Sequence, residues 1–416
     1  MADARPKLTR GLLQSLSATE GREEPLPIIV RFHERRRVTR GMTAIRGLQT
    51  GYQFHLQPFA QMRATPGAIM RLENEPEIVR IYQDLPVHAC LDVSVPHIQV
   101  PRVWEEGATG EGIRLAVVDT GIDQEHPDVA GRIMSTCDFT GEGIQDLNGH
   151  GTHCASIAAG TGAGSGGKYR GVAPDASLYI AKALDGAGNG RMSNVMAGIE
   201  WAVDEGVQVI SLSLGGSGPC DGTDALSEMC DAAVAEGVVV CAAAGNEGPE
   251  PYTVGSPGCA RDVITIGAAS DLDRIATFSS RGPTRDGRLK PDVVLPGVEI
   301  VAARAQGTRM GTPIDDHYTT ASGTSMATPH AAGICALLLQ AEPDLTPEEI
   351  KERLVRTAIA VGADAYAQGY GRVDAWRALR NELSPELPLP EPPPTVPPVG
   401  APGCLGTLVG WFPRRR

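Results

Sequence analysis

Three residues that lie far apart in the sequence could together form a nucleophilic hydrolytic centre. Ser325 ends the small-residue run 322–325, and the apolar segment 331–339 that follows has the length and the Ala and Leu content of a buried helix. We therefore expect Ser325 in the first turn of a helix, where unpaired backbone N–H groups favour negative charge. A serine there is usually only a cap, so it needs a base and an oxyanion donor to act as a nucleophile.

The acid and the base come earlier in the chain. Residues 113–118 form an apolar run that ends at Asp119, which predicts a buried strand with a carboxylate at its C-terminal edge. His150 opens a small-residue segment that is predicted to be helical. The chain order Asp, His, Ser is one of those found in catalytic triads. In such a triad His150 takes the proton of Ser325, and Asp119 orients the imidazole.

An oxyanion donor follows a further apolar run. Residues 238–243 predict a strand, and Asn246 comes shortly after it, where its side-chain amide can donate to the oxygen of an attacked peptide carbonyl. The backbone N–H of Ser325 is the second donor that we expect.

With these motifs, the chain resembles the subtilisin family of serine peptidases over roughly residues 95–379. The resemblance implies a serine endopeptidase of broad specificity with a preference for apolar P1 residues. It also implies a substrate-binding strand at Ser213, Leu214 and Gly215 and a P1 pocket whose floor is left open by Gly255. The opposite wall of that pocket would be formed by Ala243, Ala244 and Gly245.

The elements that must position these residues alternate along the chain. Strand candidates alternate with helical runs, which predicts a mostly parallel central sheet with helices on both faces and a site beyond the carboxyl ends of the strands. The strand candidates are residues 113–118, 177–182, 207–212, 238–243 and 263–266, and the helical runs are 194–205, 224–236 and 347–358, the last with Thr346 as N-cap and Glu349 three residues on. The expected class is α/β, a three-layer subtilisin-like fold over residues 91–381.

The region before this domain has a different pattern. Residues 1–25 are polar and expected to be flexible, and residues 26–90 predict a small α+β domain with strands at 28–32, 52–56 and 78–82 and a helix at 67–72. Such a domain resembles the family's inhibitory propeptide, which implies a self-processing zymogen with its own propeptide as an intramolecular inhibitor. The join at residues 86–94 is expected to be short and extended. A permanent small domain is the alternative.

The region after the domain is rich in proline. Residues 384–402 contain nine prolines, so residues 382–416 are expected to form an extended linker and a short, frayed tail. That tail could instead touch a membrane surface or a partner.

Charge and composition limit the partners. The net charge of −13 argues against nucleic acid as a partner. No stretch reaches about 18 apolar residues, so no transmembrane segment is expected. The first residues lack a continuous apolar core, so we expect no signal peptide and a cytoplasmic monomer; export by another route or a misassigned start stays open.

Nine cysteines occur without a Cys-x-x-Cys pair, which argues against zinc. Cys220 with Cys230, or Cys241 with Cys259, could form a disulfide, but buried free thiols are the expectation. Cys154 lies one helical turn after His150 and should face it, which predicts sensitivity to heavy metals.

No cofactor is expected for the chemistry. Asp128 matches a calcium ligand of the family, yet the loop 160–170 offers few side-chain oxygens and two cations, so a structural Ca²⁺ there is doubtful. Residues 162–168 fit G-x-x-x-x-G-K, but Tyr169 replaces the Ser or Thr that magnesium needs, which excludes nucleotide binding.

Two other interpretations stay open. A catalytically silent binding module would lack a working site, and a sedolisin-like acid peptidase would use a glutamate base and an aspartate oxyanion donor. His150 and Asn246 argue against both. His126, His153 and His330 are expected to be structural.

Overall fold

The computed structural model describes residues 7, 8, 12, 16, 25–33, 45–53, 58–83, 91–385 and 408–409. The chain divides into two compact units, Met1–His88 and Ala89–Arg416. Among the described residues, no helix is both long enough and apolar enough to cross a membrane.

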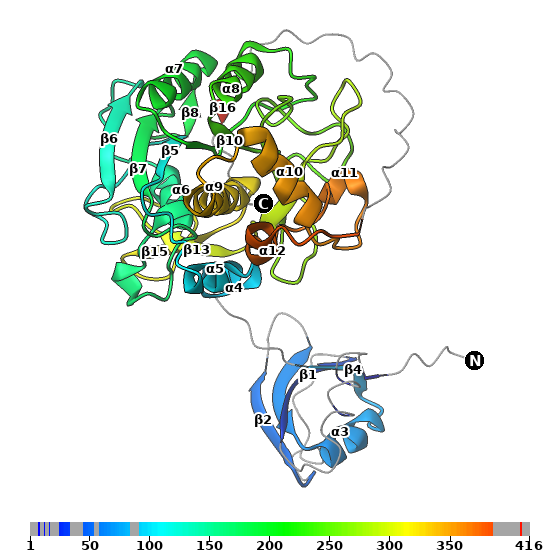
Figure 1. Ribbon diagram of the computed structural model, residues 1–416. Coiled ribbons are helices and arrows are strands. Elements are labelled where there is room, and N and C mark those ends of the chain that lie inside the picture. Colours follow the sequence, from blue (N-terminus) through cyan, green and yellow to red (C-terminus); the bar gives the residue numbers. More distant parts are fainter. Residues whose placement is uncertain are drawn as a thin grey trace. The chain divides into compact units, whose positions relative to one another are not determined.

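The N-terminal unit contains a four-stranded antiparallel sheet with helix α3 packed on it (Figure 1). Its strand order is β2-β3-β1-β4, and its elements are β1 Leu26–Phe32, β2 Leu48–Gln53, β3 Phe59–Ala64, α3 Pro66–Glu73 and β4 Ile78–Gln83. Alternate residues of β1, such as Ile28 and Val30, are buried against Ile69 and Leu72 of α3. This one-sided burial is what the α+β pattern predicts.

Three details of this unit differ from expectation. Strand β3 was not predicted at all. The second strand begins at Leu48 and not at residue 52, and residues 54–57 of the predicted strand lie outside the described residues. Part of the N-terminal stretch is packed and not loose, because Leu8 and Leu12 are buried in the small core. The backbone N–H of Ile81 also donates to the carbonyl of Lys7 (2.8 Å). A sheet this small needs these leucines to complete its core.

The second unit is built on a seven-stranded sheet of order β12-β11-β10-β9-β5-β7-β6, in which every pair of neighbours is parallel. The strands are β5 Arg114–Asp119, β6 Ile133–Asp138, β7 Ser177–Lys182, β9 Val209–Leu212, β10 Val239–Ala243, β11 Ile264–Ala269 and β12 Val293–Pro296. The predicted α/β class with a parallel sheet is confirmed.

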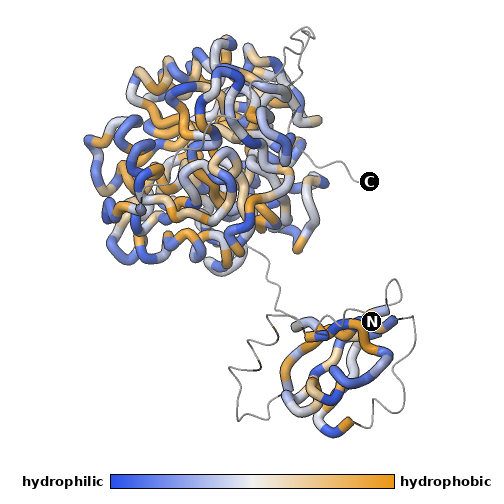
Figure 2. The backbone as a smooth tube through the Cα atoms, turned by 90° about the vertical axis from the view of Figure 1, so that its right-hand side faces the viewer, coloured by the Kyte–Doolittle hydropathy of each residue, from blue (hydrophilic) through white to orange (hydrophobic). Residues whose placement is uncertain are grey.

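Successive residues of the buried strands face opposite sides of the sheet. Helices therefore pack on both faces, and the domain has three layers. In β5, Leu115 and Val117 face the core that contains helices α6 (His150–Ala159) and α9 (Thr324–Ala341). Ala116 and Val118 face the opposite core, with α7 (Met192–Asp204) and α8 (Ala225–Ala235). Figure 1 shows α6 and α9 side by side, and Figure 2 shows hydrophobic stretches alternating with hydrophilic ones along both units. The layered arrangement places the starts of α6 and α9 near the carboxyl ends of the strands.

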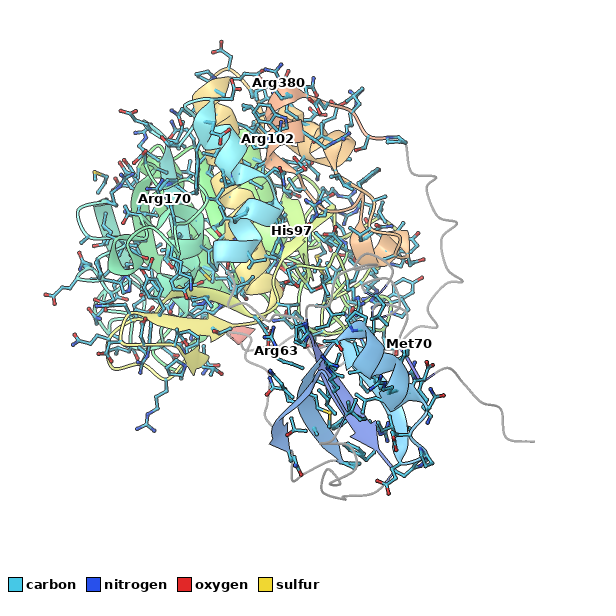
Figure 3. All side chains as sticks on the ribbon, turned by 90° about the horizontal axis from the view of Figure 1, so that it is seen from below. Arg63, Met70, His97, Arg102, Arg170 and Arg380 are labelled. Carbon is cyan, nitrogen blue, oxygen red and sulfur yellow. A yellow bond between two sulfur atoms is a disulfide. The ribbon has the colours of Figure 1, made fainter. Side chains whose placement is uncertain are left out.

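Part of the segment that joins the units is helical and not extended as predicted. Residues 84–90 lie outside the described residues, but α4 (Leu91–His97) covers the rest of the join that was expected to be extended. Helix α5 (Val100–Glu105) follows and is tied to α12 (Ala375–Arg380), because Arg102 lies 4.2 Å from the Trp376 ring centroid. Figure 3 labels Arg102 and Arg380, which both stack on that indole.

The remaining elements include the predicted helix α10 (Pro347–Thr357), in which Thr346 and Glu349 form a capping box. Elements of this unit that the pattern did not indicate include strands β6 and β12 of the central sheet and helices α4, α5 and α12. They also include the 3₁₀ turn Ala163–Ser165, β8 Asn189–Gly190, the antiparallel set β13 Ile300–Ala303, β14 Thr312–Pro313 and β15 Tyr318–Ala321, and α11 Ala365–Gln368. In the C-terminal tail, β16 (Leu408–Val409) pairs with β8, so these two residues are not frayed as expected.

Candidate active site

The acid and the base meet at the ends of two adjacent elements. Asp119 is the last residue of β5, and His150 is the first residue of α6. His150 Nδ1 lies 2.7 Å from Asp119 Oδ1, and both side chains are buried. The close approach of strand and helix requires Gly151, because a Cβ at this position would collide with the carbonyl oxygen of Gly121. The sequence thus places a carboxylate behind one nitrogen of the imidazole.

Asp146, which the sequence analysis did not single out, holds this helix start in place. Its carboxylate accepts hydrogen bonds from the backbone N–H of Gly149 (2.7 Å) and of Thr152 (2.9 Å) and from the Thr120 hydroxyl (2.9 Å). Gly149 has no side chain with which to cap α6, so Asp146 satisfies the unpaired N–H groups instead. Burial raises the pKa of Asp146. A carboxylate four residues before His150 is the signal that could have identified it.

Ser325 is the second residue of α9 and is buried. Its hydroxyl donates to the carbonyl oxygen of Ser213 (3.0 Å), and the Ser213 hydroxyl donates to the carbonyl of Ser325 (2.9 Å). Cys154 connects this residue to the base, because its sulfur lies 3.4 Å from the carbonyl oxygen of Ser325 and 3.9 Å from each ring nitrogen of His150. The serine and the imidazole therefore contact the same thiol.

Two N–H donors converge beside Ser325. The side-chain oxygen of Asn246 accepts from the backbone N–H (2.9 Å) and the hydroxyl (3.0 Å) of Thr324, which fixes the orientation of the amide. A Cβ on Gly323 would lie 3.4 Å from Asn246 Nδ2 and 3.6 Å from the backbone nitrogen of Ser325. Because Gly323 has no Cβ, both donors border the same small space, as an oxyanion hole requires.

The charge state of the base depends on its carboxylate. Burial lowers the pKa of His150, but the Asp119 carboxylate and, to a smaller extent, Cys154 together outweigh burial and raise this pKa well above the usual 6.5. His153 and His330 are also buried but contact no carboxylate; burial lowers the pKa of His153 to about 3 and that of His330 to about 4. Burial raises the pKa of the Cys154 thiol.

The predicted walls of the P1 pocket lie together. The backbone N–H of Gly255 donates to the carbonyl of Ala244 (3.3 Å), and that of Gly216 donates to the carbonyl of Ser256 (2.8 Å). A Cβ on Gly255 would collide with the carbonyl oxygen of Gly216, so only glycine allows this approach. The structure thus brings the segment from Ser213 to Gly216 beside the segments that contain Ala244 and Gly255.

A separate cavity of about 510 Å³ lies next to the start of α6. None of the predicted pocket residues line it, and the sequence analysis missed it. Its lining residues are Leu147, Asn148, Gly186, Ala187, Gly307, Thr308, Arg309 and Met310. Asn148, two residues before His150, brings this cavity next to the base.

Asp128, the doubtful calcium ligand, contacts hydrogen-bond donors. Both of its carboxylate oxygens lie 2.9 Å from the Tyr318 hydroxyl, and the backbone N–H of Gly164 donates to one of them (2.9 Å). These partners are hydrogen-bond donors, whereas a hard cation needs about six or more oxygen ligands around it. These contacts join the glycine-rich loop to β15 and give no support to the doubtful metal assignment, which stays a prediction.

The structure corrects the expected state of two cysteines. Cys220 and Cys259 form a disulfide, a pairing that the sequence analysis did not consider. Cys230 and Cys241, the partners that it did consider, are free and buried, as expected for most of the thiols. The correct pair depends on a contact between two loops, which spacing in the sequence does not encode.

A buried carboxylate–imidazole pair beside a serine at a helix start, with two converging N–H donors, defines a serine hydrolase. The model of the Subtilase family matches residues 110–371, and the chain belongs to this family. It is similar to serine protease AprX of Bacillus subtilis, with 42% identity over 70% of this chain and 72% of the relative. Subtilisin E of the same organism is 38% identical over 73% of this chain and 76% of its own length, and an intracellular serine protease of Paenibacillus polymyxa is 38% identical over 67% and 83%. The protein is thus a serine endopeptidase that acts on polypeptides, and its chemistry requires no cofactor.

Proposed function

We propose that Asp119, His150 and Ser325 are the catalytic triad of this endopeptidase. The observation that carries the proposal is the buried 2.7 Å contact between His150 Nδ1 and Asp119 Oδ1, next to a serine in the first turn of α9. Because Nδ1–H donates to the carboxylate, Nε2 is the nitrogen left to accept a proton. His150 then takes the proton of Ser325 as its oxygen attacks the peptide carbonyl, and Asp119 stabilises the imidazolium that forms.

The oxyanion of the tetrahedral intermediate would accept hydrogen bonds from Asn246 Nδ2 and from the backbone N–H of Ser325. Both donors are fixed before substrate binds, so they stabilise the developing charge without reorganising. In subtilisin, a member of this family, loss of one such donor lowers kcat by about 10²–10³, and we apply that magnitude here. Return of the proton from His150 releases the amine, and water then hydrolyses the acyl-enzyme on Ser325.

For substrate binding, we propose that Ser213, Leu214 and Gly215 pair with an extended peptide through their backbone groups. The P1 side chain would enter between this strand and the segment from Ala243 to Gly245. A preference for large apolar P1 residues over a broad range of sequences stays part of this proposal, although Gly255 packs against the Gly216 carbonyl and leaves no open space there.

The N-terminal unit is proposed to be an inhibitory propeptide that the enzyme removes from itself. Its own small core supports independent folding. Ser94 and Val95 of α4 are buried, and the Ser94 hydroxyl lies 2.9 Å from His330 Nε2. Cleavage within α4 would disrupt these contacts, so the bond should lie between the end of β4 and Leu91.

Expression of the wild type beside Ser325→Ala tests these roles. The wild type should lose its N-terminal unit and react covalently with a fluorophosphonate, while the variant keeps the full chain and does not react. N-terminal sequencing and mass spectrometry of the labelled peptide give the readout. A wild type that fails to label would indicate a silent binding module. An activity maximum in acid would indicate a glutamate-based peptidase instead.

A further inference from the structure

A disulfide connects the two segments that form the proposed substrate pocket. Cys220 follows the segment that contains Ser213 to Gly216, and Cys259 lies four residues after Gly255. Their Cα atoms are 6.0 Å apart, and 39 residues separate them in the sequence. The covalent bond therefore limits the distance between the two segments that form the sides of the proposed pocket.

The bridge is part of the packing behind this pocket. Cys259 is fully buried and forms a small apolar cluster with Ala244 and Val254, against which Cys220 packs. Ala244 is also the residue whose carbonyl accepts the hydrogen bond from Gly255. A change at the bridge is thus transmitted through direct contacts to both Ala244 and Gly255.

Other interactions would keep the fold intact if the bond were broken. The Nη2 atom of Arg288 donates to the carbonyl oxygens of Asp221 and Cys259, both at 2.8 Å, and so joins the same two segments. Ser256 also donates to the Asp224 carboxylate that caps α8 (2.6 Å). These polar contacts maintain the loops but allow more movement than a covalent bond does.

We infer that the Cys220–Cys259 disulfide is a specificity-determining brace of the substrate pocket and a site of redox modification. The inference rests on the proposed role of the segments containing Ser213–Gly216 and Gly255. With the bond intact, the pocket walls are held at a fixed separation and bind the P1 side chain tightly. With the bond reduced, the walls separate and substrate binding weakens, while the catalytic residues keep their geometry.

Reduction would begin at Cys220, which is half-buried, whereas Cys259 is inaccessible. A thiolate of an external dithiol attacks the Cys220 sulfur and forms a mixed disulfide, and Cys259 leaves as a thiolate. The second thiol of the reagent then releases Cys220. In total, two electrons and two protons pass to the protein, which gains two thiols, and the dithiol becomes a cyclic disulfide.

The test measures kcat and KM of the self-processed wild-type enzyme before and after treatment with dithiothreitol. Two peptide substrates that differ only in P1, phenylalanine against alanine, report on the pocket. Reduction should raise KM for the phenylalanine substrate roughly tenfold, change kcat little, and affect the alanine substrate less. Reoxidation should restore KM, and thiol titration with peptide mapping should follow the state of Cys220 and Cys259.

The double variant Cys220→Ser/Cys259→Ser provides an independent measurement and should show the raised KM without any response to reductant. Cys137→Ser is the control, because Cys137 is a half-buried free cysteine outside the pocket and its variant should respond like the wild type. Unchanged KM for both substrates in the reduced enzyme or in the double variant would overturn the inference, as would free thiols at both positions in the untreated protein. Loss of all activity and of fluorophosphonate labelling in every form would instead contradict the proposed function.

Discussion

His150 and His153 lie three residues apart on the same helix, both buried, yet their environments differ. Burial lowers the pKa of each imidazole. His153 Nε2 lies 3.3 Å from the backbone carbonyl of Thr319, and burial lowers its pKa to about 3. His150 contacts the Asp119 carboxylate, and its pKa is raised well above 6.5. The contact with Asp119 therefore distinguishes the proposed general base from the other buried imidazole.

The same comparison explains where the site can form. A carboxylate must reach the buried ring itself, and the end of β5 brings Asp119 to His150. His330 on α9 confirms the pattern, because its ring contacts the Met326 carbonyl (2.8 Å) and the Ser94 hydroxyl, and burial lowers its pKa to about 4. The three imidazoles are thus similarly buried, but the pKa is raised in His150 and lowered in His153 and His330.

The largest effect should come from removing the base itself. We expect His150→Ala to lower kcat by about 10⁶, the loss known for the equivalent change in subtilisin, whereas His153→Gln keeps kcat within about tenfold because it touches no reacting atom. Each inactive variant should be processed in trans by added wild-type enzyme and then assayed on a peptide p-nitroanilide. Similar losses in both variants would contradict the distinction between the two rings.

Asp119→Asn should make His150 resemble His153. We expect kcat to fall by about 10⁴, because the ring loses the partner that orients it and stabilises its cation. Wild-type activity requires neutral His150, so it should fall as the pH drops through a pKa above 6.5. In the variant, this acidic limb should move to lower pH. A pH–rate profile of kcat gives the answer, and an unmoved limb would exclude Asp119 as the cause of the raised pKa.

The structural histidines should make the fold sensitive to acid. For His330 the folded pKa of about 4 lies below the ordinary 6.5, so the unfolded chain binds the proton first, and stability present above pH 6.5 is lost as the pH falls toward 4. The loss should be about 3 kcal/mol for this residue. Urea unfolding of Ser325→Ala, which prevents self-digestion, measures it.

In the same background, His330→Gln should flatten the pH dependence of the unfolding free energy. His33→Gln is the control, since His33 is exposed and should leave the slope unchanged. An identical slope with and without His330 would show that this ring does not bind its proton on unfolding.

The smallest effect is expected at Cys154, the thiol between the base and the nucleophile. Cys154→Ser should change kcat/KM only a few-fold, because the thiol is not part of the proton path. In the wild type, however, mercuric ion should bind this sulfur beside His150 and abolish activity. The measurement is the residual rate at stoichiometric mercuric ion. The wild type and Cys137→Ser should lose activity, whereas Cys154→Ser should keep it. Full wild-type activity under these conditions would be inconsistent with such a site.

Local patterns were sufficient for much of the fold. The strands ending at Asp119 and Ala243 and the helices starting near His150 and Ser325 were predicted within a few residues, since runs of buried apolar residues and helix-start signals are short-range. The α/β class followed from their alternation. The antiparallel strands β13 to β15 were missed because they are brief and lie within a long loop.

What the sequence by itself determined is the set of chemical groups and the elements that carry them: an acid at a strand end, a base and a nucleophile at two helix starts, and an amide after a third strand. Only the tertiary structure decided their states. It pairs Cys220 with Cys259, places the Asp128 carboxylate beside a tyrosine hydroxyl, and brings the Asp146 carboxylate to the start of α6. The reason is that pairing, desolvation and pKa depend on distances between segments far apart in the chain, and these are fixed only when the layers pack.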